Sequence, residues 1–446
     1  MKKLPLAIGA TIVAVATAYG GSQWIMSSRQ QSVQSPSPSN AEVLARGRYV
    51  AQSADCFACH SVPGGKAYAG GLAMQTPVGA IYSTNITPDP ETGIGRYSLQ
   101  QFNNAVKHGV RGDGAPLYPA MPYPSYTIMP DGDIAAMYAY FMQEVTPIKQ
   151  ANQAPTMPKL MAMRWPVAYW QALFAPARAF TPNPKWDGQT NRGAYLVEGP
   201  GHCGACHTPR GAVGYQEKAL SLADNDHFLS GAVVDGWRAK SLRGEENGLG
   251  TWSEAEIALF LKTGRTDTSA AFGAMADVVE HSMQHMSDTD LHGIARYLKA
   301  LPPVTGRLAT RPRQTDTTTQ ALLDGSDVSR GAMLYTENCV ACHRADGKGV
   351  ARIFPALDGN SAVFANNAQS VIQITLEGGR MPHTPADTMA YTMPAFKQLS
   401  DADVATVVNF VRTSWSNNAA TVRTEDVTDM RHFPQQKSPH YLGEKP

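Results

Sequence analysis

The chain has 446 residues, of which 43% are hydrophobic, so it is long enough for roughly two to four domains with apolar cores. Its 38 Lys and Arg residues are nearly balanced by 37 Asp and Glu residues, and the formal net charge is +1. This balance argues against a nucleic-acid partner, because a strongly basic surface is typical of proteins that bind nucleic acid.

The N-terminus has the pattern of an export signal. Two lysines precede an uncharged apolar run over residues 4–19, and Ala16-Thr17-Ala18 matches a small-residue cleavage site. We expect residues 1–18 to be a signal peptide; the alternative is an uncleaved anchor, because the uncharged run continues beyond them. Both interpretations place the rest of the chain on the periplasmic side of the cytoplasmic membrane. Residues 19–40, rich in Ser, Gln and Pro toward their end, are expected to form a flexible leader.

Three Cys-x-x-Cys-His boxes, at residues 56–60, 203–207 and 339–343, use all six cysteines of the chain. Two thiols three positions apart on one helical turn can bond to the two vinyl groups of a haem, and the adjacent histidine can bind its iron. Zinc would need a fourth ligand that no box supplies, and disulfide pairing does not explain the histidines.

Each box is therefore predicted to bind one haem c covalently, which makes the chain an electron-transfer protein with three haems. The thioether cysteines are Cys56, Cys59, Cys203, Cys206, Cys339 and Cys342. The first axial ligands of the irons are His60, His207 and His343.

The sequence around the boxes repeats at intervals of about 140 residues, which suggests three copies of one small domain rather than a solenoid. Before each box, a predicted helix begins with an Arg-Gly pair, at residues 46–47, 192–193 and 330–331. A glycine inside a helix costs about 1 kcal/mol relative to alanine, so its repetition in register predicts close packing against another helix. We expect the last helix of each repeat to be this partner.

Two further helices are expected in each repeat. A middle amphipathic helix ends at a glycine C-cap (Gly109, Gly264 and Gly378), and the arginine that follows could pair with a haem propionate or lie solvated at the surface. The last helix begins with Asp-x-Asp at residues 131–133, 288–290 and 401–403. These aspartates are interpreted as helix-start residues, with Ser287 and Ser400 as N-caps.

A methionine opposite each histidine would raise the potential and close the iron to substrates. Within the repeat, this ligand should lie between the glycine-ended helix and the last helix. The first repeat then favours Met121 over Met129, and the third favours Met393 over Met381. Met275 has the matching spacing in the second repeat, where the alternatives in the same loop are His281, Met283, His285 and Met286.

With its boxes and repeats placed, the sequence closely resembles the tri-haem cytochrome c subunits of bacterial membrane-bound alcohol, gluconate, sorbitol and fructose dehydrogenases. The resemblance covers about residues 41–416 and is specific at family level. It rests on Thr-Asn-Ile-Thr-Pro-Asp at 84–89, Gly-His-Cys-Gly-Ala-Cys-His-Thr-Pro-Arg at 201–210, Phe-Pro-Ala-Leu at 354–357 and Met-Pro-Ala-Phe at 393–396.

The resemblance implies that a separate large subunit with flavin or pyrroloquinoline quinone oxidises the substrate, with a small third subunit where the complex has one. This chain would be membrane-associated and pass the electrons to ubiquinone, and no catalytic site of its own is predicted. The family pattern also supports Met121, Met275 and Met393 as ligands. One departure is that some relatives end in a membrane-binding tail, whereas this chain ends in a polar segment, so its mode of attachment is open.

The fold is expected to be all-α, with three tandem cytochrome c-like domains joined by irregular, Pro-marked linkers. The linker around residues 165–174 is rich in aromatic side chains, which suggests interdomain packing or a docking surface. The predicted segments are domain 1 at 41–147, a linker at 148–190, domain 2 at 191–301, a linker at 302–325, domain 3 at 326–416 and a polar tail at 417–446.

Two rival functions remain. The chain could serve a molybdenum hydroxylase or an aldehyde dehydrogenase, because the haem boxes do not determine which enzyme donates the electrons. It could also be a haem peroxidase or reductase, which would require an open iron, and the second repeat is the candidate for such a site.

Overall fold

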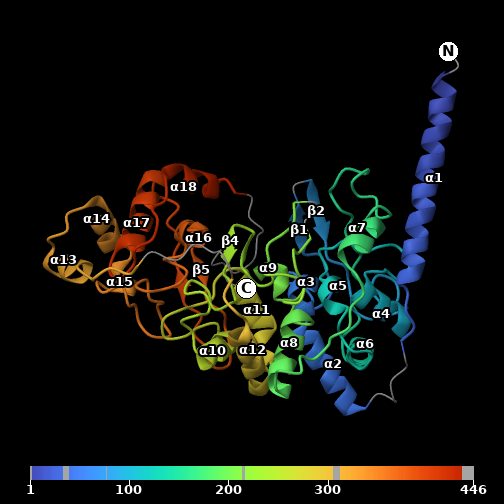
Figure 1. Ribbon diagram of the computed structural model, residues 1–446, viewed down its shortest axis with the longest axis horizontal. Coiled ribbons are helices and arrows are strands. Elements are labelled where there is room, and N and C mark those ends of the chain that lie inside the picture. Colours follow the sequence, from blue (N-terminus) through green and yellow to red (C-terminus); the bar gives the residue numbers. More distant parts are fainter. Residues whose placement is uncertain (1–2, 34–39, 77, 213–215, 305–311, 434–446) are drawn as a thin grey trace. The chain divides into compact units, whose positions relative to one another are not determined.

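The computed structural model describes residues 3–33, 40–76, 78–212, 216–304 and 312–433. Their fold is mainly α-helical, as predicted, and the strands within these residues form short two-stranded antiparallel hairpins (Figure 1). The chain divides into two compact units, the first consisting mainly of Met1–Pro182 and the second of most of the remainder. Because the second unit contains two of the three boxes, the division into three domains stays a prediction.

The first unit places α2 against α6 and α1 against α7 (Figure 1). Its core includes Phe141 of α6, whose ring contacts those of Phe102 of α4 and Tyr68, and these three side chains and Ile134 of α6 are buried. The helices are α1 (Lys3–Arg29), α2 (Ala41–Ser53), α3 (Cys56–His60), α4 (Leu99–His108), α5 (Tyr123–Tyr126), α6 (Asp131–Gln143) and α7 (Val167–Phe174), and the hairpin is β1 (Ala73–Thr76) with β2 (Gly79–Tyr82).

The second unit contains two further sets of helices around a box; the first of them places its hairpin before the middle helix, as the first unit does, and the second places its hairpin after the middle helix. Its first part contains α8 (Gly188–Glu198), α9 (Gly204–His207), the hairpin β3 (Ala232–Val234) with β4 (Trp237–Ala239), α10 (Glu254–Thr263), α11 (Ala274–His281), the 3-10 helix η1 (Met283–His285) and α12 (Asp288–Ala300). Its second part contains α13 (Thr318–Asp324), α14 (Arg330–Asn338), α15 (Val340–His343), α16 (Gln369–Glu377), the hairpin β5 (Gly379–Arg380) with β6 (Thr392–Met393), α17 (Asp401–Thr413) and α18 (Thr424–Arg431).

The glycine of each Arg-Gly pair packs against the last helix of its own repeat, which confirms the prediction. A Cβ atom at Gly47 would lie 2.0 Å from a backbone carbonyl oxygen of α6. At Gly193 it would lie 1.9 Å from the carbonyl oxygen of Gly293 in α12, and at Gly331 it would lie 2.9 Å from the Cβ of Phe410 in α17. Glycine is therefore required for these helix pairs to approach so closely.

The arginine of each Arg-Gly pair binds the second aspartate of the Asp-x-Asp motif, so these aspartates do more than begin a helix. The three ion pairs are Arg46 with Asp133 (2.7 Å), Arg192 with Asp290 (2.8 Å) and Arg330 with Asp403 (3.0 Å). The first aspartate is also paired in each repeat: Asp131 binds Lys107 and Asp288 binds Lys262, both from the last turn of a middle helix, and Asp401 binds Arg431. In each repeat, the same Arg–Asp contact therefore joins the Arg-Gly helix to the last helix.

The predicted helix caps are present. The Ser287 hydroxyl accepts a hydrogen bond from the Asp290 amide, and the Ser400 hydroxyl accepts one from the Asp403 amide. The middle helices end at Gly109, Gly264 and Gly378, whose φ angles are 65°, 74° and 67°, a region that favours glycine.

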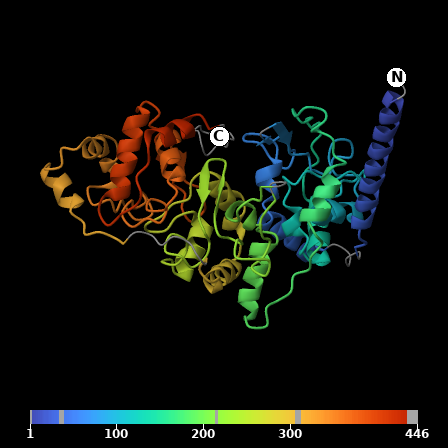
Figure 2. The same cartoon turned by 45° about the horizontal axis from the view of Figure 1, so that its top comes forward.

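Helix α18 lies within the segment that was expected to be a polar tail. It packs on α16 and α17, with Val427 and Met430 buried (Figures 1 and 2). The Arg431 guanidinium and the Thr428 hydroxyl both bind the carboxylate of Asp401 at 2.6 Å. A pattern of only two apolar residues was too short to be recognised in the sequence.

Helix α1 is held against α7 and extends into the segment that was expected to be a flexible leader. Ser22 and Met26 of α1 are buried, and the Tyr169 hydroxyl of α7 donates a hydrogen bond to the Ala18 carbonyl at 2.6 Å. At the end of α1, the Arg29 guanidinium donates to three backbone carbonyls of the first unit, those of His108, Gln171 and Ala175. Within the described residues, no helix combines the length and the apolar character that crossing a membrane requires.

Candidate haem centres

Each Cys-x-x-Cys-His box forms the next short helix after the Arg-Gly helix of its repeat, and its first cysteine is either the first helical residue (Cys56) or the N-cap (Cys203 and Cys339). The amide of His207 donates to the carbonyl of Cys203, and the amide of His343 donates to that of Cys339, both at 2.9 Å. The first cysteine and the histidine are therefore one helical turn apart. This is the local geometry that the spacing predicts for thioether attachment with an adjacent iron ligand.

The histidine of each box is oriented by a backbone carbonyl. Nδ1 of His60 lies 2.7 Å from the carbonyl oxygen of Thr84, Nδ1 of His207 lies 2.7 Å from that of Lys240, and Nδ1 of His343 lies 3.0 Å from that of Pro355. A neutral imidazole that donates its Nδ1 proton to a carbonyl presents the lone pair of Nε2 to a metal.

Burial keeps these imidazoles neutral. It lowers the pKa of all three histidines, and it lowers the pKa of His207 to about 4. Neutral imidazole is the form that binds iron, so protonation does not compete with ligation at physiological pH.

The orienting carbonyls come from corresponding places in the first two repeats. Thr84 follows strand β2, and Lys240 follows strand β4, so each hairpin delivers a carbonyl to its box. The third repeat has no such hairpin before its middle helix within the described residues and uses Pro355 of the Phe-Pro-Ala-Leu segment instead. These partners could not be predicted, because a backbone carbonyl carries no residue-type signal.

Burial raises the pKa of the first cysteine in each box, that of Cys56, Cys203 and Cys339, to about 12. Among the described residues, no three His, Cys, Asp or Glu side chains gather as a metal site built from protein ligands would require. The residues of the boxes therefore fit haem attachment better than zinc binding.

The three predicted methionine ligands differ in burial from the alternative methionines, whereas the alternative His281 is partly buried as they are. Met121, in the turn before α5, Met275 in α11 and Met393 in β6 are only partly buried. The alternatives Met129, Met283, Met286 and Met381 are 1–4% exposed, so they are enclosed by protein atoms. A thioether packed on all sides has no free face for iron, which favours the predicted set. His285 is exposed, and the axial assignments stay predictions.

Comparisons with known proteins agree with this chemistry. The sequence profile of the cytochrome c family matches residues 44–144 and 328–415, which include the first and third boxes. The gluconate 2-dehydrogenase cytochrome c subunit of Pantoea cypripedii is 50% identical over 88% of this chain and 90% of its own length. The alcohol dehydrogenase (quinone) cytochrome c subunit of Gluconacetobacter polyoxogenes is 49% identical over 89% and 86%.

This chain belongs to the family of dehydrogenase cytochrome c subunits. It is an electron-transfer cytochrome, and membership of the cytochrome c family implies covalent haem c. A nicotinate dehydrogenase subunit of Pseudomonas putida is also similar, at 40% identity over 84% of this chain but only 30% of that larger protein.

The arginines after the middle helices of this cytochrome subunit all have carboxylate partners within the protein. Arg111 binds Asp113, Arg265 lies 3.7 Å from the carboxylate of Asp387, and Arg380 lies 3.4 Å from that of Glu280. Arg111 is also 39% exposed, in line with the solvated alternative, and the pairing of these arginines with haem propionates stays a prediction. Arg265 is the notable case, because its side chain is only 2% exposed.

Proposed function

We propose that this cytochrome subunit carries three haem c groups in three tandem cytochrome c-like domains and passes electrons from a dehydrogenase large subunit to ubiquinone. The observation that carries the proposal is one histidine arrangement found three times, with Nδ1 on a backbone carbonyl and Nε2 available to iron. The repeated glycine contacts and Arg–Asp pairs support three copies of one domain.

Each haem, when bound, supplies one-electron redox chemistry. The two cysteines of a box would hold its edge, and the carbonyl bond to Nδ1 would keep the imidazole in one tautomer and orientation. The thioether opposite would raise the potential and leave no open position for a substrate. The proposed axial pairs are His60 with Met121, His207 with Met275 and His343 with Met393. Closed irons argue against the peroxidase or reductase alternative.

The proposal includes export to the periplasmic side of the cytoplasmic membrane, with attachment through the first unit. Support for attachment comes from α1 and α7, which pack together and leave large apolar side chains exposed. Trp24 is 74% exposed, Tyr19 is 51% exposed and Leu173 is 73% exposed. Exposed apolar side chains on adjacent helices are a feature of surfaces that contact a membrane or another protein.

Intact mass measurement of the exported protein tests both the haem number and the processing. We expect a gain equal to three haems, because each of the three boxes has the same histidine geometry. Cleavage after Ala18 would give an N-terminus at Tyr19; it would remove the hydrogen bond between Tyr169 and Ala18 and retain the buried Met26 and the bond of Arg29 to Gln171. A gain of two haems or fewer would refute the threefold assignment, and a chain starting at residue 1 would favour the uncleaved form.

The electron-transfer role is tested by stopped-flow spectroscopy of the complex with its large subunit, which we expect to contain flavin or pyrroloquinoline quinone. Substrate of the large subunit should reduce the haems, and a ubiquinone analogue should reoxidise them, because tethered haems exchange electrons without separate encounters. The isolated subunit should not oxidise alcohols, sugars or aldehydes. Haems that are reduced but never pass electrons to quinone would disprove the acceptor, and turnover by the subunit alone would disprove the whole role.

A second candidate partner follows from the similarity to the nicotinate dehydrogenase subunit. In this version, the chain keeps its haems and its electron-transfer role, and the large subunit is of the nicotinate dehydrogenase kind instead of the alcohol or sugar kind. Purification of the native complex distinguishes the two, because the cofactor absorbance of the co-purified large subunit identifies its class.

A further inference from the structure

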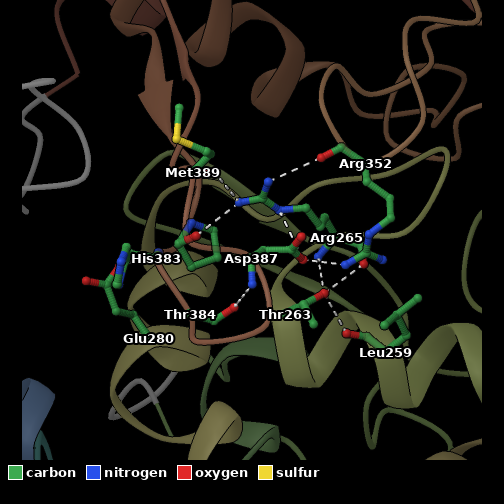
Figure 3. Close-up of polar contacts among 10 residues, drawn as sticks. Leu259, Thr263, Arg265, Glu280, Arg352, His383, Thr384, Asp387 and Met389 are labelled. Atoms are coloured by element: carbon green, nitrogen blue, oxygen red, sulfur yellow. Dashed lines mark hydrogen bonds and ion pairs between the residues drawn. The ribbon is translucent and has the colours of Figure 1, made fainter.

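The side chain of Arg265 lies inside a loop that belongs to the next repeat (Figure 3). Arg265 directly follows Gly264, the C-cap of α10 in the second repeat, and both residues lie in the second compact unit. The loop spans residues 381–391 of the third repeat, also in that unit, and connects β5 to β6. The buried guanidinium of Arg265 therefore lies in the loop of the neighbouring repeat that leads to Met393, the proposed ligand of the third iron.

The loop surrounds the guanidinium from several sides. Arg265 donates hydrogen bonds to the carbonyls of Pro382 at 3.2 Å and Met389 at 2.9 Å, near the two ends of the loop. The carboxylate of Asp387, at the loop centre, lies 3.7 Å from its Nε and also binds Arg352. A third hydrogen bond goes to the carbonyl of Arg352 at 3.2 Å. These contacts hold both arms of the loop and its middle on one rigid group.

The base of the loop leads directly to Met393. The amide of Met381 donates to the carbonyl of Tyr391 at 2.9 Å, and Gly379 of β5 pairs with Met393 of β6. Gly264 adds a steric contact, because a Cβ there would lie 2.1 Å from the ring of Pro382. The loop is therefore joined through two short paired strands to the methionine proposed as the ligand of the third iron.

A second link starts from the helix that carries Met275, the proposed ligand of the second iron. Glu280 of α11 accepts a hydrogen bond from the amide of His383 at 3.1 Å (Figure 3). Its carboxylate also lies 3.4 Å from the guanidinium of Arg380 in β5. The ligand-bearing segments of the second and third repeats are therefore tied by polar contacts at both the loop and the hairpin.

We propose that Arg265 of the second repeat is a positioning residue for the bond between Met393 and the iron of the third repeat. The inference rests on the proposed axial ligands. A thioether is a weak neutral ligand, so the bond depends on the protein holding the sulfur in place. Removal of the guanidinium would leave the carbonyls of Pro382 and Met389 without this donor and would leave Asp387 with Arg352 as its remaining ion-pair partner, so the loop would open toward water to satisfy the two carbonyls.

The test uses the haem-loaded protein and two measurements on its folded form. A general loss of stability would not change either value as long as the protein stays folded. The methionine-to-iron charge-transfer band counts the methionine ligands, and the affinity of oxidised protein for added imidazole measures how firmly each one is held. In Arg265→Gln we expect loss of about one third of the band or, if the ligand stays bound, roughly tenfold tighter imidazole binding at one iron.

Arg412 supplies the matched control. It is a buried arginine of α17 in the third repeat, and its hydrogen bonds go to the carbonyls of Val363, Ala365 and Ala420 instead of the loop. Arg412→Gln should destabilise the fold and leave both readouts unchanged. If it alters them as strongly as Arg265→Gln does, the effect is a general one and the proposal is wrong.

Two milder variants keep the test decisive if Arg265→Gln fails to fold. Asp387→Asn preserves the shape of the loop and removes its charge, and Arg265→Lys retains the charge but not the forked donor geometry. At least one of these should show tighter imidazole binding. Parent-like readouts in every folded variant would overturn the proposal. Met393→Ala distinguishes a failure of the ligand assignment from a failure of the positioning role. An unchanged charge-transfer band in this variant disproves Met393 as the ligand. A reduced band, together with parent-like readouts in the Arg265 variants, disproves only the positioning role of Arg265.

Discussion

Replacement of any one proposed methionine ligand by alanine should remove about one third of the methionine-to-iron charge-transfer band. The variants are Met121→Ala, Met275→Ala and Met393→Ala. Each side chain is only partly buried, so its loss should have a small effect on packing. Without the thioether the iron loses its sixth ligand, and the potential of that haem should fall because methionine ligation raises it. Absorbance spectra and a redox titration of each purified variant measure the two effects.

The buried methionines provide controls in the first two repeats. Met129→Ala and Met283→Ala remove side chains that are 1% and 4% exposed, and they should cost about 2–5 kcal/mol of stability through the cavities that they leave. Their charge-transfer bands should remain complete. If Met275→Ala leaves the spectrum unchanged and Met283→Ala reduces it, the ligand of the second repeat has been assigned to the wrong methionine.

Gly193→Ala should destabilise the second repeat, although alanine is normally the better helix residue by about 1 kcal/mol. The new Cβ would lie 1.9 Å from the carbonyl oxygen of Gly293, which is backbone and cannot rotate away. Helices α8 and α12 would have to separate, and overpacking of this kind costs about 1–3 kcal/mol. Chemical denaturation followed through the haem absorbance measures the loss.

Gly188 lies in the same helix and serves as the control for Gly193. A Cβ at Gly188 would have no atom within 4 Å, so Gly188→Ala should leave stability unchanged or raise it by up to about 1 kcal/mol. Equal stabilities of the two variants would mean that α8 and α12 do not pack as closely as described.

The sequence by itself determined the features that depend on short spacing. The Cys-x-x-Cys-His boxes, the glycine C-caps and the N-caps Ser287 and Ser400 are local patterns, because the groups that interact lie within one or two helical turns. The contact of Gly47 with the last helix of its repeat could also be predicted, because the same costly residue recurs in register with the same partner helix.

The tertiary structure decided the contacts between groups that are distant in the chain. The partners of the box histidines are backbone carbonyls such as that of Thr84, and every residue has a carbonyl, so no residue type marks them. Helix α18 could not be predicted, because residues 417–446 are mostly polar. Its two buried apolar side chains pack on a surface that α16 and α17 form together. Arg265 could not be assigned a partner from sequence, because the Pro382 carbonyl that it binds is 117 positions away. An isolated arginine is equally compatible with solvent, a propionate or a loop, and the choice is made by the burial that folding imposes on it.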